Sequence, residues 1–443
     1  MQNSTFHVVL VALAVLCTGC ATYTQRITRI RGAYYSNDLA GANKIVADSL
    51  PHDQNDGDLL KLEQAIIELS AGNPQTAEQL LREVRDRFDA RDGADARRAL
   101  SYLTDDTRRT YPGEDHEKVL IRAFLALSNL MHDGGDAEAY SLQMIDKQEQ
   151  IIAAGADKQG QNPKQNYPRV AVAPYLRGVL REATFHDYDD AERSYVSVVH
   201  WQPWFQAGKQ DLERAVHGHH SAPGNGVLYL FALTGRGPFK VEVVEAPSSA
   251  SLFIASEIVS AAGKQTVPPN VAPVKVPQLM AHQNSVAAIA LNVDSQPRGA
   301  TETITDVTRL AIQQYEAIYP TIVARAVARR VLKNGVVYGT KEVVGVEKGS
   351  LPGLAFDLAG LAWQAAESAD TRCWGLLPDK IQVLRVELPA GDHEISLRPV
   401  AANGATLGAP ATQTIRIADG RNTYVLANFP DRQLVGKVLV SQP

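Results

Sequence analysis

The chain has 443 residues, of which 45% are hydrophobic and 21% are charged, and its net charge is −5. This length and composition are typical of a folded protein with two or three domains, and they exclude a disordered tail. The small negative charge argues against a nucleic-acid partner, which would require a basic surface.

The N-terminus has the pattern of an exported, lipid-anchored protein. Residues 8–16 contain only Val, Leu and Ala, a run too short to span a bilayer but long enough for the core of a signal peptide. The next segment, Cys17-Thr18-Gly19-Cys20, resembles a bacterial lipobox, although Cys17 stands where leucine is usual and no Lys or Arg precedes the run. We expect residues 1–19 to be a signal peptide and Cys20 to be acylated. An ordinary secretory signal cleaved near the same point is the alternative.

This pattern predicts a location in the bacterial cell envelope. Ala21 follows the lipobox, where Asp would favour retention in the inner membrane of many Gram-negative bacteria. We therefore expect a lipid anchor in the outer membrane, with the protein facing the periplasm. Cys17 would leave with the signal peptide and Cys20 would carry lipid, so Cys373 would have no intrachain disulfide partner.

Residues 20–222 show helical periodicity broken by short turns. Units at 58–88, 117–151 and 175–195 contain apolar residues at helical spacing on both sides of a turn, and a degenerate unit precedes them at 32–50. The units resemble tetratricopeptide (TPR) repeats in their small-residue and turn positions, but they lack the early tryptophan. We expect a TPR-like helical repeat domain whose concave groove binds a partner peptide. An irregular helical bundle is the alternative.

Residues 223–443 differ in charge and pattern. The net charge is −7 up to residue 222 (24 Lys and Arg, 31 Asp and Glu) and +2 after it (20 against 18), so we place a domain boundary near 223–226. Short runs separated by Gly/Asp turns predict a β-rich, sandwich-like domain. Helical spacing predicts inserted helices near 306–333, with Pro320 starting or kinking a second segment, and near 354–369. The expected fold class is α+β multidomain.

Four segments together resemble a known group of proteins. In order they are Cys20-Ala21-Thr22-Tyr23, Tyr111-Pro112-Gly113-Glu114-Asp115, Gly235-Arg236-Gly237-Pro238-Phe239-Lys240 and Asp370-Thr371-Arg372-Cys373-Trp374-Gly375-Leu376-Leu377-Pro378. The chain resembles a family of uncharacterised bacterial lipoproteins with a TPR-like first half, and the Asp-Thr-Arg-x-Trp segment is its most specific part. The resemblance implies no reaction. It points to the cell envelope, since such proteins are often encoded near lipoproteins that activate peptidoglycan synthases.

The residues of the Asp-Thr-Arg-x-Trp segment have a predicted structural role. Alternation places Asp370, Arg372 and Trp374 on one face if the segment is extended. An Asp–Arg pair beside an indole can lock a helix onto a sheet edge, with the guanidinium stacked on the ring. Contact with a ligand is the alternative role for these three side chains.

Two further sets of residues are candidates for contacts with a partner. Aromatic side chains follow the last repeat, where they could pack between domains or form a platform for a protein or sugar: Trp201, Trp204 and Phe205. On the helix predicted after Pro320, cations recur every fourth residue and form either a solvated face or a contact for acidic glycan or lipid headgroups: Arg325, Arg329 and Lys333.

The sequence contains no complete catalytic or metal-binding motif. His217-Gly218-His219-His220 could supply imidazole ligands, but no nearby cysteine or paired carboxylate completes a site. His116 begins a segment like a zinc-protease helix, but Leu120 occupies the position of the second histidine. Cys373 lies beside Arg372 but has no recognisable histidine partner. We therefore predict no catalytic residues, no metal and no cofactor.

These features predict a lipid-anchored cell-envelope scaffold that binds partner proteins through its TPR-like domain and catalyses no reaction. One alternative is a regulator of peptidoglycan synthesis that contacts a synthase or the glycan. Another is an envelope hydrolase that uses the histidine cluster or Cys373. The expected partners are envelope proteins and the membrane, through the lipid on Cys20, with peptidoglycan as a further candidate.

Overall fold

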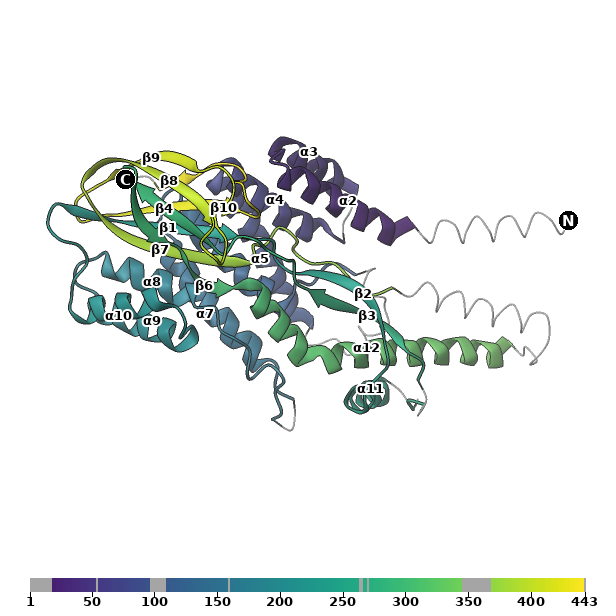
Figure 1. The fold of residues 1–443 in the computed structure, drawn as a ribbon. Coiled ribbons are helices and arrows are strands. Elements are labelled where there is room, and N and C mark those ends of the chain that lie inside the picture. Colours follow the sequence, from purple (N-terminus) through teal and green to yellow (C-terminus); the bar gives the residue numbers. More distant parts are fainter. Residues whose placement is uncertain are drawn as a thin grey trace.

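The computed structural model describes residues 18–52, 55–95, 109–157, 160–262, 266–268, 271–344 and 368–441. Helices dominate the first half of the chain and strands the second (Figure 1), so the expected α+β class is confirmed. The predicted signal peptide lies outside the described residues except for Thr18 and Gly19, and the predicted helix at 354–369 lies outside them except for Ser368 and Ala369. Among the described residues, no helix has both the length and the apolar character needed to cross a membrane.

The first half consists of consecutive helices that pack against one another in chain order. The helices are α2 (Thr18–Tyr35), α3 (Leu39–Ser49) with the short 3-10 helix η1 (Leu50–His52), α4 (Gly57–Ala71), α5 (Pro74–Asp95), α6 (Asp115–Leu130), α7 (Ala137–Ala153), α8 (Val172–Glu182), α9 (Tyr188–Trp201) and α10 (Gln206–Val216). Each helix from α3 to α9 contacts the one before it and the one after it. The units predicted at 58–88, 117–151 and 175–195 coincide with the pairs α4–α5, α6–α7 and α8–α9.

Local sequence explains where several of these helices begin and end. Asp38 caps α3 by accepting a hydrogen bond from the backbone N–H of Gly41 at 2.8 Å. Gly72 ends α4 at φ 95°, a left-handed conformation that glycine adopts without strain, and Pro74 then opens α5. Glu114 and Glu117 form a capping box at the start of α6. These signals fix the hairpin turns locally.

The described strands of the second half form three sheets. The strands are β1 (Asn225–Thr234), β2 (Phe239–Glu245), β3 (Val274–Met280), β4 (Ala288–Val293), β5 (Gln296–Ala300), β6 (Glu302–Asp306), β7 (Lys380–Pro389), β8 (Gly391–Val400), β9 (Ala411–Ile417), β10 (Asn422–Phe429) and β11 (Leu439–Val440). One sheet has the order β11-β10-β1-β7-β6, a second has the order β5-β4-β8-β9, and β2 pairs with β3 alone. β1 runs parallel to β10, and Val227 pairs with Asn422, whereas β1 and β7 are antiparallel.

β1 lies at the centre of the molecule and is buried on both faces. Its residues Tyr229 and Phe231 belong to the large apolar cluster that also contains the helices of the first half. The alternate residues Leu228 and Leu230 belong to a separate cluster shared with β4, β8 and β9 of the second sheet. The first half of the chain, the five-stranded sheet and the four-stranded sheet are thus joined by two apolar layers (Figure 1). The first of these layers crosses the boundary predicted near 223–226.

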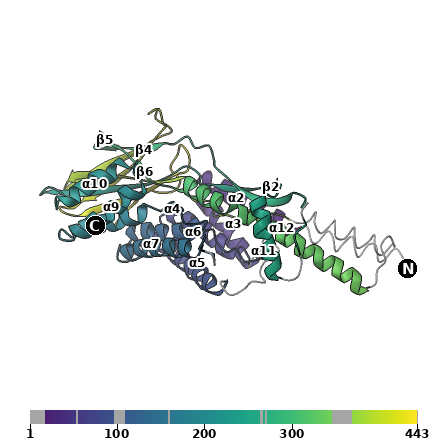
Figure 2. The ribbon, with the colours of Figure 1, turned by 90° about the horizontal axis from the view of Figure 1, so that it is seen from below.

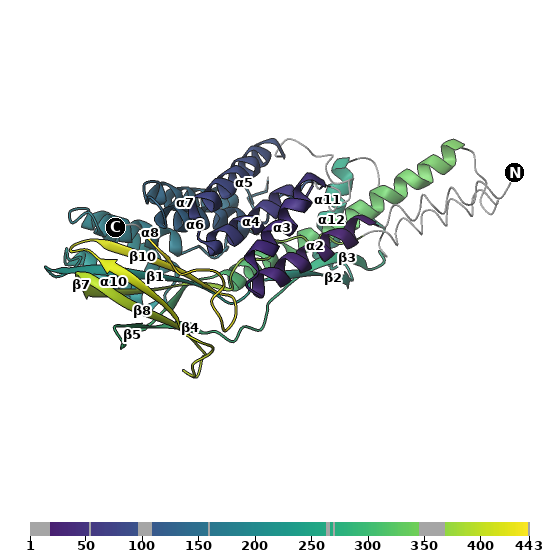
Figure 3. The same ribbon diagram turned by 90° about the horizontal axis from the view of Figure 1, so that it is seen from above.

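An arm extends from this body and consists of β2, β3, α11 (Ser249–Ala262) and α12 (Val307–Val344). Its own apolar cluster includes Ala255 of α11, Val276 of β3 and Val327 of α12. Figures 2 and 3 show the arm projecting along the long axis of the molecule. Helix α11 was not predicted from the sequence. Helix α12 is longer than the predicted 306–333, and Pro320 lies inside this single helix and does not start a new one.

Candidate functional site

Three of the four segments quoted for the resemblance, 111–115, 235–240 and 370–378, meet at one place in the fold. Residues 368–379, here called the strap, have no regular secondary structure and lie against the first helices of the first three hairpins. The Lys240 ammonium of the third quoted segment forms an ion pair with Glu114 of the second. Gly237 donates a backbone hydrogen bond to the carbonyl of Leu377 in the strap at 2.8 Å. The junction is therefore a candidate functional site, assembled from distant parts of the chain.

Arg372 anchors the strap through its charge. Its Nη1 lies 2.9 Å from Asp56 Oδ1 and 2.8 Å from the carbonyl of Arg109, and its Nη2 lies 2.7 Å from Asp370 Oδ2. Burial would raise the pKa of Asp370, but hydrogen bonds and charge from Arg372 outweigh it and lower that pKa. The guanidinium lies 5.4 Å from the ring centroid of Tyr111. The expected stacking of Arg372 on Trp374 was wrong, because the guanidinium faces Tyr111. The expected sheet edge was also wrong, because Arg372 joins the strap to Asp56 and Arg109 of the helical half.

Trp374 fixes the strap through packing. The indole is almost fully buried, and its ring centroid lies 5.4 Å from that of Phe124 on α6. Its Nε1 donates a hydrogen bond to the carbonyl of Leu62 on α4 at 3.0 Å. Because a buried indole N–H needs an acceptor, this bond sets the orientation of the ring as well as its depth.

Two buried carboxylates hold the backbone of the strap. Glu117 on α6 accepts a hydrogen bond from the backbone N–H of Trp374 at 2.7 Å. Glu63 on α4 accepts from the backbone N–H groups of Gly375 and Leu376, both at 2.8 Å. Burial raises the pKa of Glu63 to about 7, against the opposing effects of Arg31 and of these two N–H donors. The two side chains thus act as a clamp on three successive peptide groups, here called the carboxylate clamp.

The strap approaches α2 so closely that the Arg31 side chain would have to move if residue 375 carried a Cβ. A Cβ placed on Gly375 would lie 1.6 Å from Nη2 of Arg31. The same guanidinium is 3.8 Å from Oε1 of Glu63 and 3.9 Å from Sγ of Cys373. Cys373 itself is buried, and burial raises the pKa of its thiol. A buried thiol with a raised pKa is a poor nucleophile, which argues against the hydrolase alternative at this residue.

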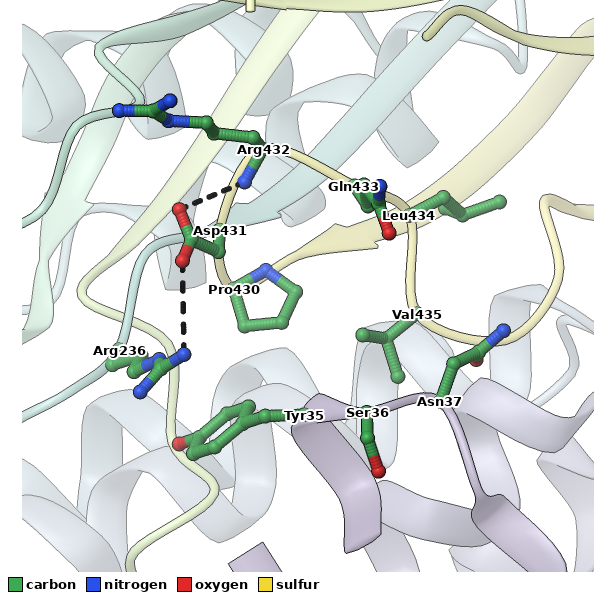
Figure 4. A pocket seen from close by; sticks show the side chains of 10 residues that line it. All are labelled: Tyr35, Ser36, Asn37, Arg236, Pro430, Asp431, Arg432, Gln433, Leu434 and Val435. Atoms are coloured by element: carbon green, nitrogen blue, oxygen red, sulfur yellow. Dashed lines mark hydrogen bonds and ion pairs between the residues drawn. The ribbon is translucent and has the colours of Figure 1, made fainter. Parts of the chain in front are cut away.

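A pocket of about 290 Å³ lies beside the strap, where the turn between α2 and α3 meets the segments that follow β1 and β10 (Figure 4). Arg236 lies 4.1 Å over the ring centroid of Tyr35 and 3.7 Å from Asp431. Tyr35 in turn donates a hydrogen bond to the carbonyl of Gly375 at 3.3 Å. Because β1 and β10 are parallel, both segments leave the same edge of the sheet. The pocket wall is therefore continuous with the strap.

The comparisons with known proteins do not identify the chain. No family model matches it, and neither a curated protein nor a solved structure matches it. The resemblance to bacterial lipoproteins therefore rests on the quoted sequence segments alone, and membership of that family is a proposal.

The structure separates the three aromatic candidates. Trp204, in the turn between α9 and α10, is 67% exposed. Trp201 is half-buried at the end of α9, with the Arg169 guanidinium 5.7 Å from its ring. Phe205 is 1% exposed, and its ring lies 5.6 Å from that of Tyr175. Its assignment as a partner contact was wrong, because the ring belongs to the core.

The predicted basic stripe on α12 is not exposed as a whole. Arg325 is exposed, whereas Arg329 is 6% exposed. Arg329 cannot present its charge to a partner, so its assignment as a contact was wrong. The reason is that α12 packs against α11 and β3 in the arm, which the sequence did not reveal. The side chain of Lys333 lies outside the described residues.

The histidine cluster is not gathered into a metal site. His217 and His219 are exposed, but His220 is buried, and its Nε2 lies 2.8 Å from Asn422 Oδ1. Burial lowers the pKa of His220. Within the described parts of the chain, no three His, Cys, Asp or Glu side chains are grouped so that they could hold a metal ion.

The carboxylates that hold the strap, Glu63 and Glu117, were not among the predicted site residues. Glu63 lies in the apolar stretch of α4, between Leu62 and Ala65, where an acid is unexpected. Glu117 lies in the first turn of α6, where an acid is already explained by the helix N-terminus. The signal available for Glu63 was its position on the apolar face of a predicted helix. A buried carboxylate needs polar partners, so an acid at such a position indicates a contact with another segment.

Proposed function

We propose that this protein is a lipid-anchored scaffold of the bacterial cell envelope that binds partner proteins through its helical half and catalyses no reaction. In this proposal the chain is a member of the lipoprotein family it resembles, and the helix pairs are TPR-like repeats. The two sheets that share an apolar cluster then form the sandwich-like part. The stacking of successive helix pairs supports the repeat assignment.

The strap covers part of the face made by the first helices of the hairpins. Arg31 on α2, Glu63 on α4 and Glu117 on α6 all contact it. In this proposal the partner therefore binds to another surface of the helical half.

The observation that carries the proposal is the exposure of Trp204 between α9 and α10. Tryptophan is a large side chain that is rarely left in water, and it is enriched among residues that dominate protein interfaces. Trp201, half-buried on the preceding turn, supports the same surface. We assign the partner contact to this tryptophan surface, Trp201 and Trp204, at the end of the hairpin stack.

Site-specific photo-crosslinking in the native bacterium tests this surface. A photoreactive phenylalanine analogue replaces Trp204, and a matched variant carries it at Gln413, which is exposed on β9 of the second sheet. The proposal expects a crosslinked product with an envelope protein at position 204 and none at 413. Equal yields at the two positions, or no product at 204, would contradict it. Capture of a peptidoglycan synthase would favour the alternative function, a regulator of peptidoglycan synthesis.

The anchor is tested independently. Cys20→Ser is expected to abolish incorporation of labelled fatty acid and to release the protein from the outer-membrane fraction. Continued labelling of this variant would contradict the lipidation site. Because the variant leaves Trp204 unchanged, failure of the anchor can be separated from failure of the partner surface.

A further inference from the structure

The pocket beside the strap carries a positive and a negative charge side by side. Figure 4 shows Arg236 and Asp431 together on one side of it, with the rings of Tyr35 and Pro430 and the Val435 side chain around the rest. Pro430 is buried and Val435 is 3% exposed, so the apolar part of the wall is firmly packed. The volume of about 290 Å³ is at the small end of the range for ligand pockets and suits a small molecule better than a polypeptide.

Arg236 is held in position without a ligand. Its guanidinium lies 4.1 Å over the ring centroid of Tyr35. Its backbone N–H donates a hydrogen bond to Oδ1 of Asn284 at 2.9 Å, and its carbonyl accepts one from Nδ2 of the same side chain at 3.1 Å. The next residue, Gly237, is bound to the strap. Because these contacts already restrict the arginine, binding of a ligand to it costs little conformational entropy.

The charged groups of Arg236 and Asp431 do not satisfy each other. Nη2 of Arg236 is 3.7 Å from Oδ2 of Asp431, beyond the length of about 2.7–2.9 Å that is usual for a charge-assisted hydrogen bond. The other carboxylate oxygen, Oδ1, accepts a hydrogen bond from the backbone N–H of Arg432 at 2.9 Å, which orients the carboxylate. Within the part of the chain that the structure describes, neither the Arg236 guanidinium nor Oδ2 of Asp431 makes a hydrogen bond. The Arg432 side chain extends away from Tyr35 and Val435 (Figure 4).

We propose that this pocket binds a free α-amino acid with an apolar side chain, its carboxylate on Arg236 and its ammonium on Asp431. A guanidinium presents paired N–H donors that match a carboxylate, and an ammonium supplies the donor that Oδ2 lacks. Both charged groups of an α-amino acid are attached to one carbon atom, which matches the adjacent positions of Arg236 and Asp431. The side chain of the ligand lies against Tyr35, Pro430 and Val435. This inference goes beyond the proposed function and does not depend on it.

A zwitterion suits the pocket better than a ligand with a single charge. A simple carboxylate or phosphate on Arg236 would bring its negative charge next to Asp431, and a simple amine on Asp431 would lie next to Arg236. Each like-charge contact opposes binding, whereas a zwitterion makes an opposite-charge contact with both residues. A peptide is a poorer match, because each added residue places its two charged termini farther apart.

Isothermal titration calorimetry on the full-length protein in detergent tests the requirement for both charges. The probes are L-leucine and D-leucine, leucinamide, which lacks the carboxylate, and isocaproate, which lacks the ammonium. We expect one leucine enantiomer to bind about tenfold more tightly than either analogue, because each analogue loses a charge-assisted contact and gains a like-charge one. Equal affinity for leucine and one of the analogues, or no binding of either enantiomer, would overturn the inference.

Substitutions of the two charged residues locate the binding site. Asp431→Asn keeps the shape of the side chain, and it should weaken leucine binding by about tenfold and strengthen isocaproate binding. Arg236→Gln should abolish the binding of both. Because Arg236 is 35% exposed and Asp431 is 58% exposed, both variants should fold, which circular dichroism checks.

The matched control is Arg193→Gln on α9, where the side chain is 74% exposed. It should leave the affinity for leucine unchanged. A purely structural role of Asp431 would not shift the preference from leucine toward isocaproate. Leucine binding that is unchanged in Asp431→Asn or in Arg236→Gln would overturn the assignment of the ligand to this pocket.

Discussion

Replacing Arg372 with methionine removes the charge that ties the strap to the first half of the chain. Methionine fills similar space but cannot pair with Asp56 and Asp370, whose carboxylates are buried or nearly so. Breaking a buried ion pair by removing one partner costs about 3–5 kcal/mol, because the remaining charge stays buried. Asp56 keeps a distant neighbour in Arg26 at 3.9 Å, which offsets part of the loss. We therefore expect the free energy of unfolding to fall by about 4 kcal/mol.

Urea denaturation followed by circular dichroism measures this loss. The matched control is Arg193→Met on α9, where the arginine side chain is 74% exposed and pairs with Asp190 three residues earlier. An exposed pair of this kind contributes about 0–1 kcal/mol, so the control should be nearly neutral. Arg372→Lys should fall between the two, because an ammonium retains the charge but loses the paired geometry of the guanidinium.

A second substitution separates buried charge from lost packing. In the Arg372→Met background, changing Asp56 and Asp370 to asparagine removes the uncompensated charges. If charge explains the loss, this triple variant should recover a large part of it. A loss below about 1 kcal/mol in Arg372→Met, or no recovery in the triple variant, would refute the reasoning that buried charge fixes the strap.

Three further predictions concern the same junction. Trp374→Ala should lower the free energy of unfolding by about 3–5 kcal/mol, whereas Trp204→Ala should change it by less than about 0.5 kcal/mol; the same urea titrations compare them. The pKa of Glu63 is raised from 4.5 to about 7 in the folded protein, so its stabilising effect is complete below pH 4.5 and is lost as the pH rises through 7. Relative to Glu63→Gln, the wild-type protein should lose about 3 kcal/mol between pH 4 and pH 8, and a flat difference would contradict this. The Cys373 thiol should resist maleimide in the folded protein and react in urea, and rapid labelling of the folded protein would show that it is accessible.

The helix pairs could be predicted because their turns are encoded locally. Gly72 and Pro74 stop one helix and start the next within three residues, and neither depends on the rest of the fold. β1 is a continuous apolar run, which is the local signal of a buried strand. The sequence alone did not show that its alternate residues face two different apolar clusters, because that depends on which elements cover each side.

The remainder could not be predicted because it depends on contacts between distant residues. The bond from Glu117 to the strap spans 257 residues, and those from Glu63 span more than 300. Helix α11 was missed because its Ser- and Ala-rich sequence lacks a charged face and therefore shows weak periodicity. Phe205 and Arg329 were predicted to be exposed. The sequence near Phe205 does not indicate that Tyr175 packs against it, and the sequence near Arg329 does not indicate that α11 packs against α12.

The strap gives the proposed scaffold a fixed geometry. Figures 1 and 2 place α9 and α10 toward the end of the molecule opposite the start of α2. The tryptophan surface and the proposed anchor are therefore far apart along the long axis. Because the helical half and the five-stranded sheet share one apolar cluster, and because the carboxylate clamp and Arg372 tie them together, no flexible linker sets this separation. A scaffold built in this way presents its partner surface at a constant height above the bilayer, which a chain of loosely tethered domains cannot do.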